Sequence, residues 1–342
     1  MLRKKRITPD QTHLHLLEGI SFRPIFILGP HRSGTTILFN LLASSGAFNY
    51  LTLHQIVYYD QLLDDHLNGR TSQVKQELID RFDRLGYKDR VFDGIPLSPD
   101  APEEYGFVLQ VTKRNPLVTM LRPYHGPFAN RFARHLQLNG DTVALFSEMC
   151  RKIQFLAGAD RPILLKNPYD FNNFKEILRH FPAAKFIFNH RHSLHVLNSQ
   201  VRTLHSIFSS KNEALALIGR DYAAMYKDSR VREANRRTYA PGNKKGILSV
   251  LPSLTWTANH FVEEVRGFPA EHYVSLRYED LCSNPRRQIG RLLDFLGLRP
   301  EREVAFDTIQ PRQQKLLPEI EAEGPRIRAS LSPYLTYNGY EL

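Results

Sequence analysis

The residues that could bind an anion gather in one short stretch near the N-terminal end of the chain. Residues 24–28 form an apolar run typical of a buried strand, and a loop from Gly29 to Gly34 separates it from a helical pattern over residues 35–42. Backbone N–H groups at a helix start lack partners and carry about half a positive charge, so a phosphate fits there. The side chains that could join it are Arg32, Ser33, Thr35 and Thr36.

The loop departs from that of nucleotide triphosphatases at one position. Its spacing is that of G-x-x-x-x-G-K-[ST], but Thr35 stands where that motif has the lysine that reaches the terminal phosphates. Arg32 is the only cation in the loop, and hydroxyl donors follow it. The pattern therefore predicts a phosphate site that needs no metal ion. An ordinary strand-to-helix turn of small residues is the alternative.

A second group of polar residues lies in the second half of the chain. The pattern there is strand, helix, strand, helix, which implies parallel pairing, and ligands bind beyond the carboxyl ends of such strands. Lys166 and Arg191 fall at those ends, and Ser199 follows Arg191 by eight residues. Arg191 and Ser199 can hold a second phosphate, although this spacing alone is more often a structural arginine. The predicted strands cover 163–165 and 185–189, and the predicted helices 171–180 and 193–203.

The composition indicates a globular protein. Its 342 residues, 42% hydrophobic and 24% charged, allow a large α/β core. The net charge of +11 favours an anionic partner such as a phosphorylated cofactor, nucleic acid or a membrane surface, but the basic residues are scattered, so a solvated basic surface explains it equally well. Two cysteines are too few for a disulfide framework and no apolar run approaches a membrane span, so we expect a cytoplasmic protein.

Taken together, these stretches resemble a known family. Residues 29–42, GPHRSGTTILFNLL, resemble the 5′-phosphosulfate loop of sulfotransferases that use 3′-phosphoadenosine 5′-phosphosulfate (PAPS), and residues 185–202 resemble their 3′-phosphate segment. Residues 164–186 and 276–298 look like the lysine-containing strand and the C-terminal strand and helix of tyrosylprotein and bacterial-type members. The resemblance implies an α/β fold of P-loop type, with three layers and a central, mainly parallel sheet flanked by helices.

The resemblance also implies roles for individual residues. The backbone and side chains of residues 31–36 would hold the 5′-phosphosulfate, and Arg191 with Ser199 would hold the 3′-phosphate. Lys166 matches a lysine that contacts the bridging oxygen or the sulfuryl group in relatives. Transfer to a hydroxyl or amine then needs in-line positioning and a base for the acceptor proton. No metal ion is expected, and the product would be adenosine 3′,5′-bisphosphate (PAP).

The identity of the base stays open at this stage. In relatives it is a Glu or His, often some twenty residues after the loop arginine, and His54 lies in that position here. Glu104, beside Glu103, is the rival because related bacterial-type enzymes carry acidic residues in this region. A buried structural histidine and a glutamate at a helix start are the alternatives for these two residues.

The strand and helix pattern predicts one large domain. Residues 1–23 read as a polar lead-in, residues 24–320 as the sulfotransferase-like domain and residues 321–342 as a C-terminal tail. Residues 51–160 are expected to form a mostly helical insertion on the acceptor side. Trp256 lies in an amphipathic helical stretch, and we expect it to pack in the core rather than stack on an adenine.

The leading hypothesis is therefore PAPS-dependent sulfuryl transfer. A P-loop kinase or triphosphatase is the first alternative, and the missing lysine at Thr35 argues against it. A non-catalytic module that keeps the fold to bind an anionic partner such as RNA is the second, and we expect no nucleic-acid partner because a surface binder does not need two phosphate sites at strand ends. The acceptor, whether small molecule, lipid, sugar or peptide, and the number of subunits are not readable from the sequence.

Overall fold

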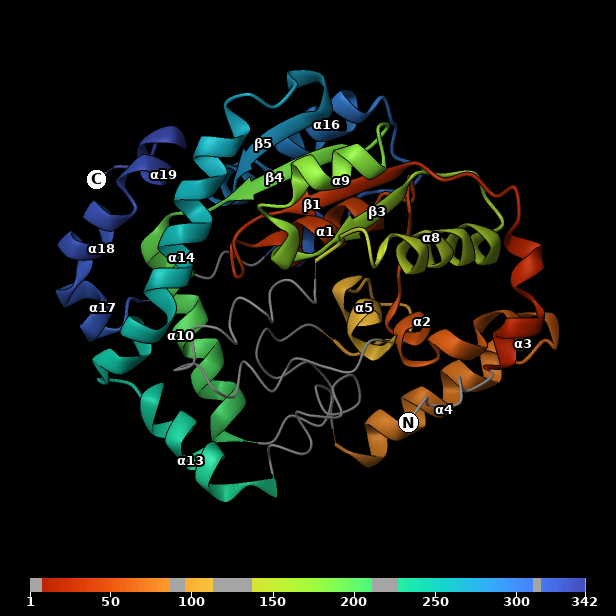
Figure 1. Cartoon of the computed structure of the whole chain (residues 1–342), viewed down its shortest axis with the longest axis horizontal. Coiled ribbons are helices and arrows are strands. Elements are labelled where there is room, and N and C mark those ends of the chain that lie inside the picture. The colour runs from red at the N-terminus through yellow and green to blue at the C-terminus, as the bar shows by residue number, and fades with distance from the viewer. Residues whose placement is uncertain (1–7, 87–95, 113–136, 211–226, 310–314, 342) are drawn as a thin grey trace.

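Five parallel strands form a sheet at the centre of the computed structural model, which describes residues 8–86, 96–112, 137–210, 227–309 and 315–341 (Figure 1). The strand order across this sheet is β2-β3-β1-β4-β5. The strands are β1 (Pro24–Leu28), β2 (Asn49–Tyr50), β3 (Ile163–Lys166), β4 (Lys185–His190) and β5 (Tyr273–Arg277). The prediction of a central, mainly parallel sheet is confirmed, because every strand pair in this sheet is parallel.

The central strand β1 sets the position of the other elements. It pairs with β3 on one side and with β4 on the other, with Ile27 opposite Lys166 and Leu28 opposite Phe188. All five residues of β1 are buried, as expected for a strand covered on both faces. Because the strands are parallel, the segments that follow β1, β3, β4 and β5 meet at one edge of the sheet, where ligands bind in folds of this type.

The alternating residues of β1 face two separate hydrophobic clusters. Ile25 and Ile27 pack in the cluster on one face, and Phe26 and Leu28 pack in the larger cluster on the other. This gives three layers, with a sheet between two sets of helices. The helices of the smaller cluster are α1 (Thr35–Ser44), α15 (Tyr278–Ser283) and α16 (Pro285–Leu296).

The larger cluster is covered by helices from both halves of the chain. In Figure 1, α10 and α14 lie beside one end of the sheet, and α17, α18 and α19 lie outside them. The helices that cover the larger cluster are α5 (Gly106–Thr112), α8 (Val143–Ala157), α9 (Phe174–His180), α10 (Ser193–Ser209), α14 (Lys244–Val265), α17 (Pro318–Ala322), α18 (Gly324–Ser330) and α19 (Ser332–Tyr337).

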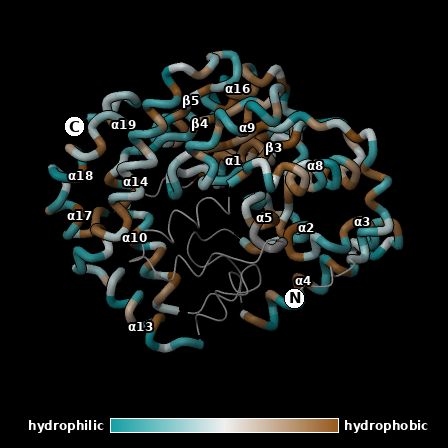
Figure 2. The backbone as a smooth tube through the Cα atoms, viewed as in Figure 1, coloured by the Kyte–Doolittle hydropathy of each residue, from teal (hydrophilic) through white to brown (hydrophobic). Residues whose placement is uncertain are grey.

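The remaining helices are peripheral in that they lie away from the strands (Figure 1), although α2 and α3 contribute Ile56 and Leu62 to the larger cluster. Hydrophobic residues gather on the strands and the helices against them, whereas the outer helices alternate polar and apolar residues (Figure 2). None of the described helices is long and apolar enough to cross a membrane. The peripheral helices are α2 (Leu53–Val57), α3 (Leu62–Leu67), α4 (Thr71–Arg84) and α13 (Ser229–Thr238), with short 3-10 turns at Pro9–Thr12, Leu14–Leu17, Tyr59–Gln61, Pro168–Asp170, Ala270–His272 and Phe306–Thr308.

Two features at the C-terminal side differ from a plain interpretation of the sequence. The stretch expected as a tail contains α18 and α19, and its residues Ile327, Leu331 and Leu335 are fully buried in the larger cluster. The expectation that Trp256 packs in the core is wrong, because its side chain is 63% exposed on α14 and stacks on His260 with 5.0 Å between ring centroids.

Acid is expected to destabilise this fold through His190. The ring is fully buried against Tyr334, whose hydroxyl lies 3.0 Å from Nδ1, and burial lowers the pKa of His190 from 6.5 to about 3. The unfolded chain takes up this proton near pH 6.5 and the folded chain does not, so stability falls as the pH drops, by about 2 kcal/mol between pH 7 and pH 5. Urea denaturation at both pH values should show a smaller loss for His190→Gln than for wild type, and an equal loss would contradict the prediction.

Candidate active site

The loop after β1 folds against the end of β4. Asn189, the second-last residue of β4, donates a hydrogen bond from its side-chain amide to the carbonyl of Ser33 over 2.8 Å. Arg32 adopts φ 74°, a left-handed conformation that is rare outside glycine. Helix α1 then begins at Thr35, and among the described residues no side chain caps its N-terminus. The first backbone N–H groups of α1 are thus available to an anion.

The structure brings the two predicted phosphate sites together at this loop. The Arg32 Nε donates to the hydroxyl of Ser199 over 3.2 Å, although 167 residues separate them. Arg191, at the end of β4, donates from Nη1 to the carbonyl oxygen of Arg32 over 3.3 Å. Residues assigned from sequence to the 5′ and 3′ ends of one cofactor therefore form one cationic surface.

Tyr278, the first residue of α15 after β5, is a site residue that sequence reasoning missed. A Cβ added to Gly34, whose φ is +96°, would lie 2.3 Å from Cδ2 of Tyr278, so the ring fits only against a glycine. The Arg191 guanidinium carbon lies 4.4 Å from the centroid of the same ring. Tyr278 thus sets the distance between the loop and Arg191 through packing and a cation–π contact. The YEDL sequence at residues 278–281, which follows a predicted strand, is the pattern from which Tyr278 could have been chosen as a site residue.

The neighbouring acidic residues of YEDL hold the C-terminal segment and the strand end. Glu279 accepts hydrogen bonds from the His192 backbone N–H at 3.1 Å and from the Tyr340 hydroxyl at 2.7 Å. Asp280 pairs with Arg277, with a shortest distance of 2.8 Å. Both carboxylates are therefore engaged by groups other than the loop arginine, and Arg191 keeps its positive charge directed at the loop.

Buried polar atoms beside the loop include two possible donors that have no hydrogen-bond partner among the described residues. They are the hydroxyl oxygen of Ser33 and Nε of Arg191. Leaving such a group unpaired costs about 1–3 kcal/mol, and the cost is recovered when an acceptor arrives. A guanidinium and a hydroxyl suit the oxygens of a phosphate, so the residues at this edge fit an anionic cofactor.

Lys166 and Glu104 form a second part of the site. Lys166 is completely buried at the end of β3, and its Nζ lies 2.9 Å from Oε1 of Glu104 and 3.0 Å from the hydroxyl of Thr36 on α1. The Glu104 side chain keeps 16% of its surface exposed. The lysine thus joins the anion-binding helix to a carboxylate that solvent reaches.

The ring of His31 also belongs to this part of the loop. It stacks near Tyr169 with 6.3 Å between centroids, and its backbone carbonyl accepts a hydrogen bond from Gln200 at 2.7 Å. Burial, and next the charge of Arg32, lower the pKa of His31 to about 4, with smaller effects from Glu104 and Lys166. The imidazole is therefore neutral at physiological pH and can donate or accept one hydrogen bond beside the Lys166–Glu104 pair.

The structure places His54 in a different environment. It lies in α2, is 4% exposed, and its ring centroid is 5.6 Å from that of Tyr58. Burial lowers its pKa to about 4, and among the described residues the charges that act on it belong to Lys75, Asp100 and Asp65. Of the two candidate bases, the geometry brings Glu104 to Lys166, whereas the buried Nε2 of His54 has no hydrogen-bond partner among the described residues.

Two parts of the insertion expected on the acceptor side at residues 51–160, namely residues 87–95 and 113–136, fall outside the described residues. Within the described residues, no cluster of three or more His, Cys, Asp or Glu side chains could hold a metal ion.

Comparisons with known proteins give matches along most of the chain. Residues 24–248 match the family described as the sulfotransferase family, and residues 250–316 match the sulfotransferase domain. The chain is 26% identical over 329 residues to omega-hydroxy-beta-dihydromenaquinone-9 sulfotransferase Stf3 of Mycobacterium bovis and of Mycobacterium tuberculosis, covering 93% of this chain and 70% of the relative.

Two solved structures share the fold. Sulfotransferase STF9 from Mycobacterium avium has a TM-score of 0.66 and 18% identity, with 97% of this chain and 81% of that chain covered. Sulfotransferase STF1 from Mycobacterium tuberculosis H37Rv has a TM-score of 0.62 and 17% identity, with 95% and 80% covered.

Proposed function

The chain belongs to the sulfotransferase family, and from this premise we propose that it moves the sulfuryl group of PAPS to a hydroxyl or amine of its acceptor, in line and without a metal ion. The observation that carries the proposal is the contact of Lys166 with both Thr36 and Glu104. This contact joins a phosphate-binding helix start to a carboxylate that can take a proton. A site that only bound an anion would not need that carboxylate.

We assign cofactor binding to the loop, to Arg191 directly after β4 and to Ser199 in α10. The backbone and side chains of the loop hold the 5′-phosphosulfate, while Arg191 and Ser199 hold the 3′-phosphate. The unpaired Ser33 hydroxyl and Arg191 Nε support this assignment, since each gains an acceptor on binding. The loop residues in this assignment are Arg32, Ser33, Gly34, Thr35 and Thr36.

The chemistry is divided between Glu104 and Lys166. Glu104 takes the proton of the acceptor hydroxyl as that oxygen bonds to sulfur, and the electron pair of the broken sulfur–oxygen bond passes to the leaving phosphate. Lys166, with Thr36, stabilises the negative charge that develops on that oxygen, where a buried cation acts strongly because water is excluded. His31 supplies a neutral hydrogen-bonding group beside them.

For the acceptor we propose the hydroxyl of an apolar lipid. The Stf3 relatives act, by name, on a hydroxylated dihydromenaquinone, and they align with 93% of this chain. The first acceptors to test are prenylquinones with a terminal hydroxyl, beside a phenol, a sugar and a tyrosine peptide as competitors. We further place the enzyme in the cytoplasm, a location that suits its two free cysteines, Cys150 and Cys282.

Calorimetry with PAP tests the cofactor assignment directly. We expect PAP to bind equally well with magnesium or with a chelator, and more tightly than ATP with magnesium. Tighter binding of ATP would overturn the proposal in favour of a kinase or triphosphatase.

Arg191→Ala should weaken PAP binding by about 1.5–3 kcal/mol, the range for hydrogen bonds to charged groups, which is roughly 10- to 150-fold in Kd. The matched control is Arg236→Ala on α13, which removes an arginine that pairs with Glu233 on the surface. The Kd of the Arg236→Ala variant for PAP should equal that of wild type. Equal affinity of Arg191→Ala and wild type would show that the 3′-phosphate lies elsewhere.

A further inference from the structure

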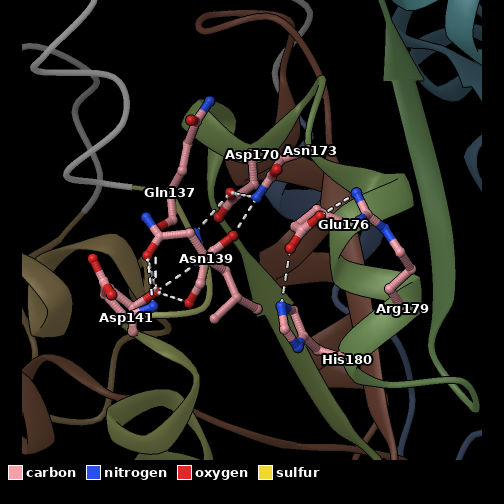
Figure 3. A network of polar contacts seen from close by, with 10 residues as sticks. Gln137, Asn139, Asp141, Asp170, Asn173, Glu176, Arg179 and His180 are labelled. Carbon is pink, nitrogen blue, oxygen red and sulfur yellow. Dashed lines mark hydrogen bonds and ion pairs between the residues drawn. The ribbon is translucent and has the colours of Figure 1, made fainter.

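The buried carboxylate of Asp170 contacts the chain neighbours of Lys166 and Glu104 and has no role in the proposed chemistry. Asp170 is completely buried in the 3-10 turn after β3 and accepts hydrogen bonds from four donors. They are the Tyr105 hydroxyl, the Asn167 side-chain amide at 2.8 Å, the Leu138 backbone N–H at 2.9 Å and the Asn173 side-chain amide at 3.0 Å. Figure 3 shows Asp170 between Asn173 and the segment that contains Gln137 and Asn139.

Two of these donors are the immediate chain neighbours of the reacting pair. Tyr105 follows Glu104, and Asn167 follows Lys166. The backbones of the two segments also meet, because the Tyr105 N–H donates to the Lys166 carbonyl over 3.3 Å. A Cβ added to Gly106 would lie 2.9 Å from Oδ1 of Asn167, so the start of α5 is pressed against the residue after the lysine.

The protonation states keep this network in one arrangement. Burial and the charge of Asp170 raise the pKa of Tyr105 well above its ordinary value, so its hydroxyl keeps its proton and donates. Burial raises the pKa of Asp170 to about 6, while the donors around it act in the opposite direction. Near neutral pH the carboxylate is ionised and all four donors point at it. A neutral side chain at this position could satisfy only some of them.

We propose that Asp170 is a positioning residue for sulfuryl transfer, acting through Tyr105 on Glu104 and through Asn167 on Lys166. The inference rests on the proposed function, in which Glu104 is the base and Lys166 the cation. Asp170 touches neither the cofactor nor the acceptor. Its hydrogen bonds with Tyr105 and Asn167 fix where the Glu104 carboxylate and the Lys166 amine lie. A shift of about 1 Å at such groups can lower a rate on the order of 100-fold.

Tyr105→Phe is the main test, because it removes one hydroxyl and keeps the ring in the core. The rate is measured as sulfuryl transfer from radiolabelled PAPS to water, as released sulfate, and to a hydroxylated prenylquinone. We expect roughly a 10- to 100-fold lower kcat with Kd for PAP changed less than about twofold. Asp170→Asn should do the same. The matched control, Tyr59→Phe, removes another buried hydroxyl that donates to a carboxylate, Glu148, and should leave kcat unchanged.

A double-mutant cycle separates positioning from general destabilisation. In the Glu104→Gln background, adding Tyr105→Phe should change the remaining rate less than about twofold, because the base that it positions is gone. Full kcat in Tyr105→Phe, or losses that multiply in the double variant, would overturn the inference. Failure of the proposed function would differ, since the wild type would then not bind PAP, or Glu104→Gln alone would keep its rate.

Discussion

Replacing Lys166 with methionine is expected to lower the rate of sulfuryl transfer by about 100- to 1,000-fold, the range for removing one preorganised charge-stabilising donor. The side chain is completely buried and its ammonium contacts both Glu104 and Thr36. Methionine fills nearly the same volume without the charge, so the cation is lost while the packing is kept. Single-turnover transfer from labelled PAPS measures the chemical step, and calorimetry with PAP shows whether cofactor binding survives.

Lys152→Met is the control for this variant. Lys152 is also buried, at 2% exposure, and it pairs with the carboxylate of Asp10 at 2.8 Å, in contacts separate from the loop. Removing one partner of a buried ion pair is destabilising, so this variant should unfold at lower temperature and yet retain the wild-type transfer rate. If Lys166→Met kept the wild-type rate, the lysine would be a structural residue and the proposed mechanism would fail.

Glu104→Gln is expected to lower kcat by about 100- to 10,000-fold, the usual contribution of a general base. The amide keeps the shape of the side chain and can still accept a hydrogen bond from Lys166, but it cannot take a proton at neutral pH. PAP affinity should change little, because the proposed cofactor contacts lie on the loop, on Arg191 after β4 and on Ser199 in α10. Steady-state kinetics with PAPS and a prenylquinone acceptor would measure the effect.

His54→Gln decides between the two candidate bases in the same assay. The environment of His54, with Tyr58 and the charges of Lys75, Asp100 and Asp65, leads us to expect an activity within about threefold of wild type. The reverse pattern, with His54→Gln inactive and Glu104→Gln active, would return the base to the position expected from the loop spacing. Loss in both variants would indicate that His54 supports the fold of the acceptor side.

The strands and helices around the phosphate site were predictable because each has a recognisable pattern in its own stretch of sequence. The apolar run before Gly29 gave β1 with the same bounds as the structure, and Lys166 and Arg191 fell at strand ends as expected. The helix predicted from residue 171 begins at Phe174 instead, since Pro168 and the Asn167 side chain first form a 3-10 turn. The helical pattern of the sequence does not predict that turn. The turn places Asp170 close to the end of β3.

The contacts that complete the site have no local signal. Tyr278 meets Gly34, and Arg32 meets Ser199, only because β1, β4 and β5 are neighbours in the sheet. In the same way, the contact of Glu104 with Lys166 is visible only in the fold, and the choice of Glu104 over His54 as the base stays a prediction. Trp256 shows the opposite error, since a bulky aromatic on an amphipathic helix suggested burial and the helix presents it to solvent.

The strand order has a further consequence while the chain is being synthesised. β1 leaves the ribosome about 130 residues before its partner β3, which at 5–20 residues per second is about 7–26 s. During that interval its apolar residues have no strand to pair with, so a nascent chain stalled before β3 should be prone to aggregation and to capture by chaperones. The phosphate loop precedes β4 and Tyr278 in the chain, so it reaches its final shape only after both have emerged.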